Sequence, residues 1–153
     1  MLPDKQDEVR GLGFVTLHSA YLESSIHELL LLLAPIEEYP EEQHTWPIDR
    51  KIKVAKKRLK LLNENEFVEM RKTLSCAEKC FKRRNEVIHS ATYSGRYKRQ
   101  NLISTRPGVP PRSIDSKEIY TLSEDLRELD RKMAIPMLRL IPEAVNRYEV
   151  NRT

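Results

Sequence analysis

Apolar residues follow the three-and-four spacing of an α-helix along most of the chain. The first stripe predicts a long helix over residues 5–34 and consists of Leu12, Val15, Ser19, Leu22, Ile26, Leu29 and Leu33. Pro35 ends this helix, and residues 36–47 are rich in Glu and Pro, which favours a loop. Thr45-Trp46-Pro47 then predicts the start of a second helix, with an inner face made of Ile52, Ala55, Leu59 and Leu62.

A third helix is expected after a break at residues 63–65, with Asn65 as its N-cap. One apolar stripe on it consists of Phe67, Met70, Leu74, Ala77, Phe81 and Ile88. A second stripe lies beside the first and consists of Thr73, Cys76, Cys80 and Val87. Position 84 falls between both stripes, where the spacing predicts an apolar side chain, but the residue there is Arg84.

The last predicted helix begins near Thr121, because Thr121 and Glu124 have the spacing of a capping box. Its inner face consists of Leu122, Leu126, Leu129, Met133, Met137 and Leu140. Pro136 should kink this helix, since proline removes a backbone donor and clashes with the preceding turn. Pro142 should either end the helix or begin a further turn.

Glycine and proline between residues 90 and 120 argue against a long helix there. Residues 102–105 and 118–122 are predicted to pair as a small hairpin. With 153 residues, the chain suits a single domain over residues 1–153. The expected fold is therefore all-α, a four- to five-helix bundle with a long loop or small hairpin before the last helix.

Charge is distributed unevenly along the chain. Residues 1–49 carry ten acidic and two basic side chains, whereas residues 50–153 carry thirteen acidic and twenty-five basic ones. Residues 50–60 alone hold seven Lys or Arg and no acid. This asymmetry favours an anionic partner for the later part of the chain. The alternative is that helices of opposite charge face each other or the solvent.

Several classes of protein and site are not expected. The longest apolar run is far shorter than the ~20 residues that cross a bilayer, so no membrane partner is expected. The N-terminus lacks the apolar core of a signal peptide, which favours the cytoplasm. Cys76 and Cys80 are then expected to be free thiols. Together with His18, His27 and His44 they match no zinc spacing, and no metal or cofactor site is predicted.

Arg84 requires an anionic partner, a ligand or a partner subunit, because burying a lone guanidinium is costly. A structural ion pair with Glu23 or Glu28 would satisfy it equally well. His89 lies five residues further, about 140° around the helix, and Asn85 and His89 share one face at a spacing of four. The three side chains can therefore form one site only if the helix end faces a groove. Histidine is the usual proton-transfer residue near neutral pH.

The stretch Arg84-Asn85-Glu86-Val87-Ile88-His89 resembles the signature of the HEPN superfamily, in which Arg and a polar residue, often Asn, precede His near the end of a bundle helix. The segment Leu17-His18-Ser19-Ala20-Tyr21-Leu22-Glu23 is similar to the opening helix of such domains. The resemblance covers the helical order across most of the chain, while the motif itself is short.

The resemblance implies a compact HEPN-type helical bundle that forms a homodimer with the two motifs at the interface. It implies a metal-independent RNA endonuclease that uses Arg84, Asn85 and His89, needs no cofactor and leaves 2′,3′-cyclic phosphate ends. Such proteins act as toxins or in defence and stress responses. Other members have lost activity and bind RNA, nucleotides or a partner protein, which is the alternative expectation here.

Basic and aromatic side chains flank the motif or follow it in the loop, and they suit phosphates and unstacked bases. The predicted RNA-binding residues are Arg83, Tyr93, Arg96, Tyr97, Lys98 and Arg99. The alternative is a solvated loop whose charges only aid solubility. An antitoxin protein is a further expected partner. Some HEPN toxins carry a Tyr two residues after the His, where antitoxins modify it, but this chain has Ala91 there.

Overall fold

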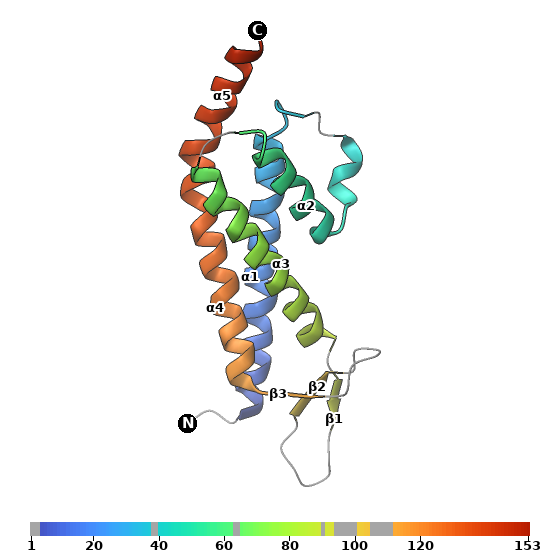
Figure 1. Ribbon diagram of the computed structural model, residues 1–153. Helices are drawn as coiled ribbons and strands as arrows, with labels where there is room; N and C mark the ends of the chain where they lie inside the picture. Colours follow the sequence, from blue (N-terminus) through green and yellow to red (C-terminus); the bar gives the residue numbers. More distant parts are fainter. Residues whose placement is uncertain (1–3, 38–39, 63–64, 90, 94–100, 105–111) are drawn as a thin grey trace. The chain divides into compact units, whose positions relative to one another are not determined.

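A computed structural model describes residues 4–37, 40–62, 65–89, 91–93, 101–104 and 112–153 of the chain. Its helices are α1 (Asp4–Leu32), α2 (Ile48–Leu59), α3 (Glu66–Ile88), α4 (Ser116–Ile135) and α5 (Ile141–Arg152), as Figure 1 shows. The 3₁₀-helix η1 (Glu41–Thr45) precedes α2, and the π-helical turn η2 (Pro136–Leu140) joins α4 to α5. The prediction of an all-α helical bundle is confirmed.

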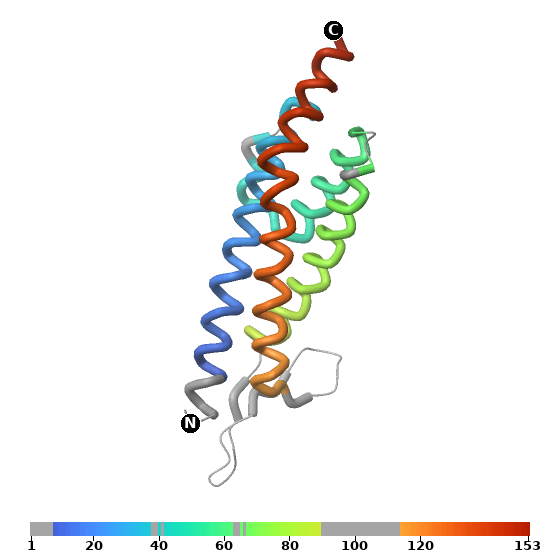
Figure 2. Tube along the Cα trace, turned by 90° about the vertical axis from the view of Figure 1, so that its left-hand side faces the viewer, coloured from blue at the N-terminus to red at the C-terminus, as the bar shows by residue number. Residues whose placement is uncertain are grey.

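The helix boundaries follow signals in the sequence. The first helix ends at Leu32, close to the predicted end before Pro35. Pro47 directly precedes α2, and the backbone carbonyl of Asn65 accepts a hydrogen bond from Val68 N at 3.0 Å at the start of α3. Pro136 begins the π-helical turn, and Pro142 lies in the first turn of α5. Figure 2 shows the chain passing from α4 through this turn into α5 as one continuous helical rod.

The start of α4 was predicted wrongly at Thr121. The helix begins at Ser116, and the side chain of Asp115 accepts a hydrogen bond from the backbone N–H of Glu118 at 2.8 Å. Asp115 is therefore the residue that caps the first turn. Asp115 and Glu118 have the same capping-box spacing as Thr121 and Glu124, one and a half turns earlier.

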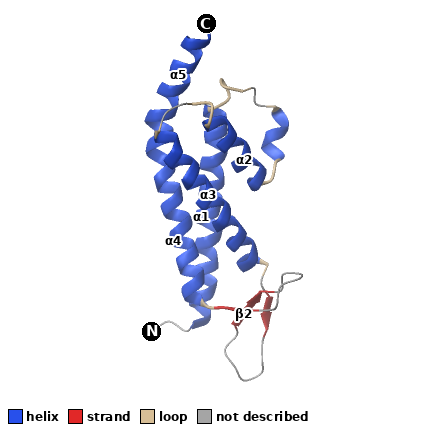
Figure 3. Ribbon diagram, viewed as in Figure 1, coloured by secondary structure: helices blue, strands red, loops and turns tan. Residues whose placement is uncertain are grey.

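A small antiparallel sheet lies between α3 and α4 in the chain (Figure 3). Its strands are β1 (Ala91–Tyr93), β2 (Asn101–Ser104) and β3 (Arg112–Ile114), with β2 in the centre. The predicted strand at 102–105 is confirmed over its described residues. Its predicted partner at 118–122 is wrong, because those residues belong to α4 and β2 pairs with β1 and β3 instead.

The chain divides into two compact units, each made of separate segments. Unit 1 comprises residues 1–20 and 79–127, and unit 2 comprises residues 21–78 and 128–153. The helices α1, α3 and α4 each contribute to both units. The buried core of unit 1 includes Val15, Cys80, Phe81, Val87, Ile114, Ile119, Leu122 and Leu126. That of unit 2 includes Leu22, Ile26, Leu29, Leu33, Ile52, Leu59, Phe67, Met70, Leu74, Met133 and Ile141.

In unit 1, α1 and α4 approach each other closely at a glycine. A Cβ atom on Gly11 would lie 2.8 Å from the Cγ2 atom of the buried Ile119 and 3.2 Å from the ring of Tyr120. One turn further along α1, the ring of Phe14 packs edge-on against Tyr120, with 6.3 Å between the centroids. The contact therefore depends on the missing side chain of Gly11.

In unit 2, polar contacts accompany the core between elements. Ser25 of α1 donates a hydrogen bond to the carboxylate of Asp130 on α4. The rings of His27 on α1 and His44 in η1 lie 4.7 Å apart, and Lys51 Nζ donates to the backbone carbonyl of His44 at 3.3 Å. Among the described residues, no helix is long and apolar enough to cross a membrane.

Candidate functional site

The candidate site lies at the C-terminal end of α3, in unit 1. Arg84 and Asn85 belong to the last two turns of this helix, and His89 directly follows its last residue, Ile88. The backbone N–H of His89 donates to the carbonyl of Asn85 at 3.0 Å, so the last turn extends to His89. Arg84 is half-buried, whereas Asn85 and His89 are exposed. We refer to Arg84, Asn85 and His89 as the α3-end motif.

Arg84 and Asn85 are joined through their side chains. The Oδ1 atom of Asn85 accepts hydrogen bonds from Arg84 Nε at 3.1 Å and from Nη2 at 2.9 Å. The guanidinium also lies over the ring of Phe81, with 5.0 Å from Cζ to the ring centroid. Phe81 is buried, so Arg84 covers a core aromatic with its stem and keeps its charged head near the surface.

These contacts explain the arginine at an apolar position of the pattern. Position 84 lies at the border of the core, where an arginine can cover Phe81 without losing all of its hydration. The alternative ion pair of Arg84 with Glu23 or Glu28 stays a prediction. The structure thus joins Arg84 to Asn85 through side chains, and His89 to Asn85 through the backbone.

Arg83, a predicted RNA-binding residue, forms an ion pair within unit 1. Its Nη1 atom lies 2.8 Å from Asp125 Oδ2 on α4, and 38% and 46% of the two side chains are exposed. The hydrogen bond to Asp125 raises the pKa of Arg83 above its usual range. The position therefore has a structural role in linking α3 to α4, and its contact with RNA stays a prediction.

The other predicted RNA-binding residues follow the motif. Tyr93 is the last residue of β1, which pairs with β2. Arg96, Tyr97, Lys98 and Arg99 lie outside the described residues. Their contribution to RNA binding stays a prediction.

The fully buried cation of the described chain is Arg58, which the sequence pattern did not single out. Its side chain is 2% exposed, and its Nε atom lies 3.5 Å from Glu37 Oε2. The sequence did contain a signal for the burial of Arg58, because Ala55, Arg58 and Leu62 follow the same three-four spacing as the inner face of α2. The ion pair with Glu37 indicates a structural role for this arginine.

Metal ligands do not gather in the described part of the chain, where no cluster of three or more His, Cys, Asp or Glu side chains is found. Cys76 is an exposed free thiol and Cys80 a buried one. Compared with protein-family models, with curated proteins and with solved structures, the chain gives no match.

Proposed function

We propose that the chain is a metal-independent RNA endonuclease of the HEPN type that uses Arg84, Asn85 and His89. The observation that supports this proposal best is the linked arrangement of the α3-end motif. Asn85 fixes the guanidinium of Arg84 with two hydrogen bonds, while His89 stands exposed at the end of the same helix. A fixed cation and an exposed imidazole at the same helix end suit the cleavage of a phosphodiester.

The proposed reaction is transesterification within the RNA strand. One His89 takes the proton from a ribose 2′-hydroxyl, and the 2′-oxygen attacks the adjacent phosphorus. The bond from phosphorus to the 5′-oxygen breaks, and an acid donates a proton to that leaving oxygen. Arg84 stabilises the charge on the phosphorane-like transition state. The products are a 2′,3′-cyclic phosphate and a 5′-hydroxyl.

This scheme needs an acid and a base, and each chain supplies one histidine in the motif. We therefore propose a homodimer in which two copies of His89 and Arg84 meet. Asn85 orients Arg84, as its two hydrogen bonds indicate, or contacts the phosphate when RNA is bound. The biological role that fits such an enzyme is that of a toxin or a defence or stress effector, with an antitoxin protein as its partner.

The test is a cleavage assay on a broad panel of RNA, with EDTA present and the product ends analysed. The wild type should cleave to cyclic-phosphate ends, whereas His89→Ala should be inactive and Arg84→Ala should cleave about 100-fold more slowly. Lys79→Ala is the matched control, because Lys79 is an exposed cation about one and a half turns before Arg84 on the same helix. We expect it to cleave like the wild type.

Three results would overturn the proposal. If the wild type cleaves no RNA but binds it in a salt-dependent manner, the chain is an inactive HEPN-like binding module. If His89→Ala cleaves as fast as the wild type, the activity comes from another site or a contaminant. Protein binding without RNA binding would leave a helical adaptor, whose basic second helix would contact an acidic partner.

A further inference from the structure

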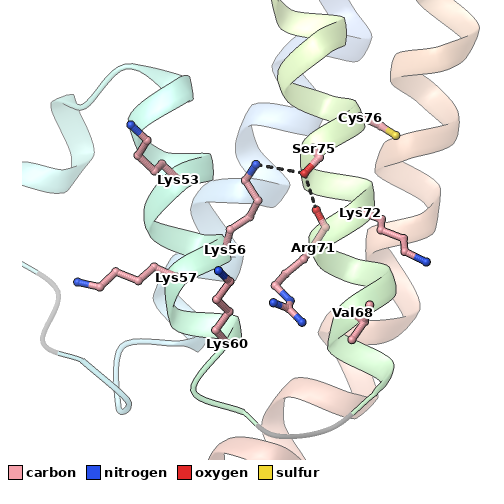
Figure 4. A pocket seen from close by; sticks show the side chains of 9 residues that line it. All are labelled: Lys53, Lys56, Lys57, Lys60, Val68, Arg71, Lys72, Ser75 and Cys76. Atoms are coloured by element: carbon pink, nitrogen blue, oxygen red, sulfur yellow. Dashed lines mark hydrogen bonds between the residues drawn. The ribbon is translucent and has the colours of Figure 1, made fainter.

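A groove lined mainly by basic residues lies between α2 and α3 in unit 2 (Figure 4). Its volume is about 920 Å³, within the range of ligand-binding pockets. We call it the basic groove, and it is lined by Lys53, Lys56, Lys57, Lys60, Val68, Arg71, Lys72, Ser75 and Cys76. None of these residues belongs to the α3-end motif, which lies in unit 1.

The positive charge of the groove is only partly balanced by acids. Lys56 pairs with Glu78 at 3.2 Å, and Lys72 pairs with Glu69 at 2.7 Å. The other four cations are Lys53, Lys57, Lys60 and Arg71. None of them forms an ion pair with any residue that the structure describes. Figure 4 shows Lys60 and Arg71 in the gap between the two helices, whereas Lys53 and Lys57 extend from α2 away from α3. An anion held along the groove would be stabilised by this excess of positive charge.

Arg71 gives a second, independent indication of a ligand. Its Nε atom is buried and makes no hydrogen bond with any of the described residues. Figure 4 shows the side chain reaching from α3 toward α2, on the side of Lys60. A buried donor without an acceptor is costly, and an anionic oxygen in the groove would satisfy it.

The arrangement of the lysines indicates the shape of the anion. Lys53, Lys57 and Lys60 recur at steps of four and three, so they share one side of α2 over roughly 10 Å. A row of this kind suits an extended ligand with repeated charges. The lysine ammonium group is a compact charge with rotatable donors, so it can bind phosphates that lie at slightly different positions.

The remaining lining offers charge and apolar surface but no platform on which bases could stack. The groove-lining residues include no aromatic side chain for base stacking, and Val68, Cys76 and the lysine stems give it an apolar wall. We propose that the basic groove binds the sugar–phosphate backbone of single-stranded RNA, without sequence preference. This inference rests on the proposed function, which makes RNA the substrate, and adds a binding site apart from the α3-end motif.

The test measures the affinity of the full chain for a fluorescently labelled oligouridylate by anisotropy. The His89→Ala background keeps the RNA intact, and the groove variant carries Lys57→Ala and Lys60→Ala. The control variant carries Arg139→Ala and Arg152→Ala, which remove two exposed cations of unit 2 outside the groove. All four positions are exposed, and circular dichroism checks that each variant is folded.

We expect the groove variant to bind about tenfold more weakly, and the control to stay within about twofold of the wild type. The slope of log Kd against log salt should become shallower by about 1.4, because each phosphate contact to a single strand contributes roughly 0.7.

Equal affinity of the groove and control variants would overturn the inference. Displacement of the RNA by polyglutamate at the same charge concentration would also overturn it, since the groove would then accept any polyanion, including an acidic protein. The two proposals fail separately. If the wild type never cleaves RNA but the groove variant loses RNA binding, only the nuclease proposal is rejected. If the wild type cleaves RNA and the groove variant binds RNA as well as the control does, only the groove proposal is rejected.

Discussion

The α3-end motif and the basic groove both carry positive charge, but the protein holds the two sets of cations differently. Arg84 is fixed by the two hydrogen bonds that it donates to Asn85 Oδ1 and by the ring of Phe81, and its neighbour Arg83 is fixed by Asp125. In the groove, no such ion pair fixes Lys57 or Lys60 among the described residues.

The difference separates two tasks that an RNA-cleaving enzyme has to perform. A transition state is stabilised by charge that is already in place, because a group that must first reorient loses much of its effect. A strand is retained by mobile charges that follow the backbone and release counterions. We therefore expect the motif to govern the rate of cleavage and the groove to govern affinity.

The largest expected effect is on the steady-state constants kcat and KM, which distinguish transition-state stabilisation from RNA binding. Arg84→Ala should lower kcat by about 100-fold with little change in KM, because one preorganised charge is lost at the transition state. The pair Lys57→Ala and Lys60→Ala should instead raise KM by about tenfold and leave kcat unchanged. If both variants change the same constant by similar factors, the separation between motif and groove is wrong.

A second prediction compares two glycines on one turn of α1, in the unit that holds the motif. A Cβ on Gly11 would clash with Ile119 at 2.8 Å, whereas a Cβ on the exposed Gly13 would meet nothing within 4 Å. Both substitutions to Ala favour the helix by about 1 kcal/mol. Gly11→Ala should nevertheless unfold more easily than Gly13→Ala, by about 1–3 kcal/mol, because the packed site is overfilled.

Urea unfolding of the two variants measures this difference. The fixed position of Arg84 requires a firmly packed unit 1. Gly11→Ala should therefore lower the rate of RNA cleavage more than it lowers the affinity of the basic groove in unit 2 for RNA. Equal unfolding free energies for the two variants would show that α1 and α4 can separate at Gly11 without cost. The firm support that we assume for the motif would then be absent.

The sequence predicted most of the fold because helical periodicity is a local signal. The stripes from Val15 to Leu33 and from Phe67 to Phe81 are buried as expected. The start of α4 and the partner of β2 were predicted wrongly, because two capping signals competed and strand pairing depends on residues far apart in sequence. Local pattern cannot choose between such alternatives.

The candidate site was predictable only in part, for a similar reason. Arg84 stands out as a cation at an apolar position, and its neighbour Asn85 is its partner. The ion pair of Arg83 with Asp125 joins residues 42 positions apart and leaves no mark in the sequence. The basic groove was visible as a run of lysines on α2, but its second wall, with Arg71, depends on how α3 packs.

A third prediction sharpens the comparison inside the groove itself. Lys56 donates hydrogen bonds to Ser75 Oγ at 3.1 Å and to Glu78 Oε2 at 3.2 Å, whereas its neighbour Lys57 is exposed. Lys57→Ala should weaken RNA binding by roughly three- to fivefold, because a mobile phosphate contact is lost. Lys56→Ala should change the affinity by less than about twofold, since Glu78 already balances its charge. Anisotropy titrations compare the two.

The fourth prediction concerns the ion pair beside the motif. A double-mutant cycle with Arg83→Ala and Asp125→Ala should give a coupling free energy of about 0.2–1 kcal/mol, because both side chains are partly exposed and screened by solvent. Arg83→Ala should weaken RNA binding less than Lys57→Ala does, because Asp125 already balances part of its charge. A loss of affinity as large as that of Lys57→Ala would place Arg83 among the RNA-binding cations.

The smallest expected effect is a pH dependence of stability in the unit that carries the groove. Burial, followed by the nearby charges of Lys51 and His44, lowers the pKa of His27 below its usual value. The unfolded chain then binds the proton more readily, so stability is unaffected above about pH 6.5 and falls as the pH drops toward the lowered pKa. The melting temperature should fall less in His27→Gln than in the wild type between pH 7.5 and about pH 5. Parallel curves of melting temperature against pH for the two proteins would show that His27 is equally easy to protonate in the folded and unfolded chain. The contact of His27 with His44 would then not affect the stability of unit 2.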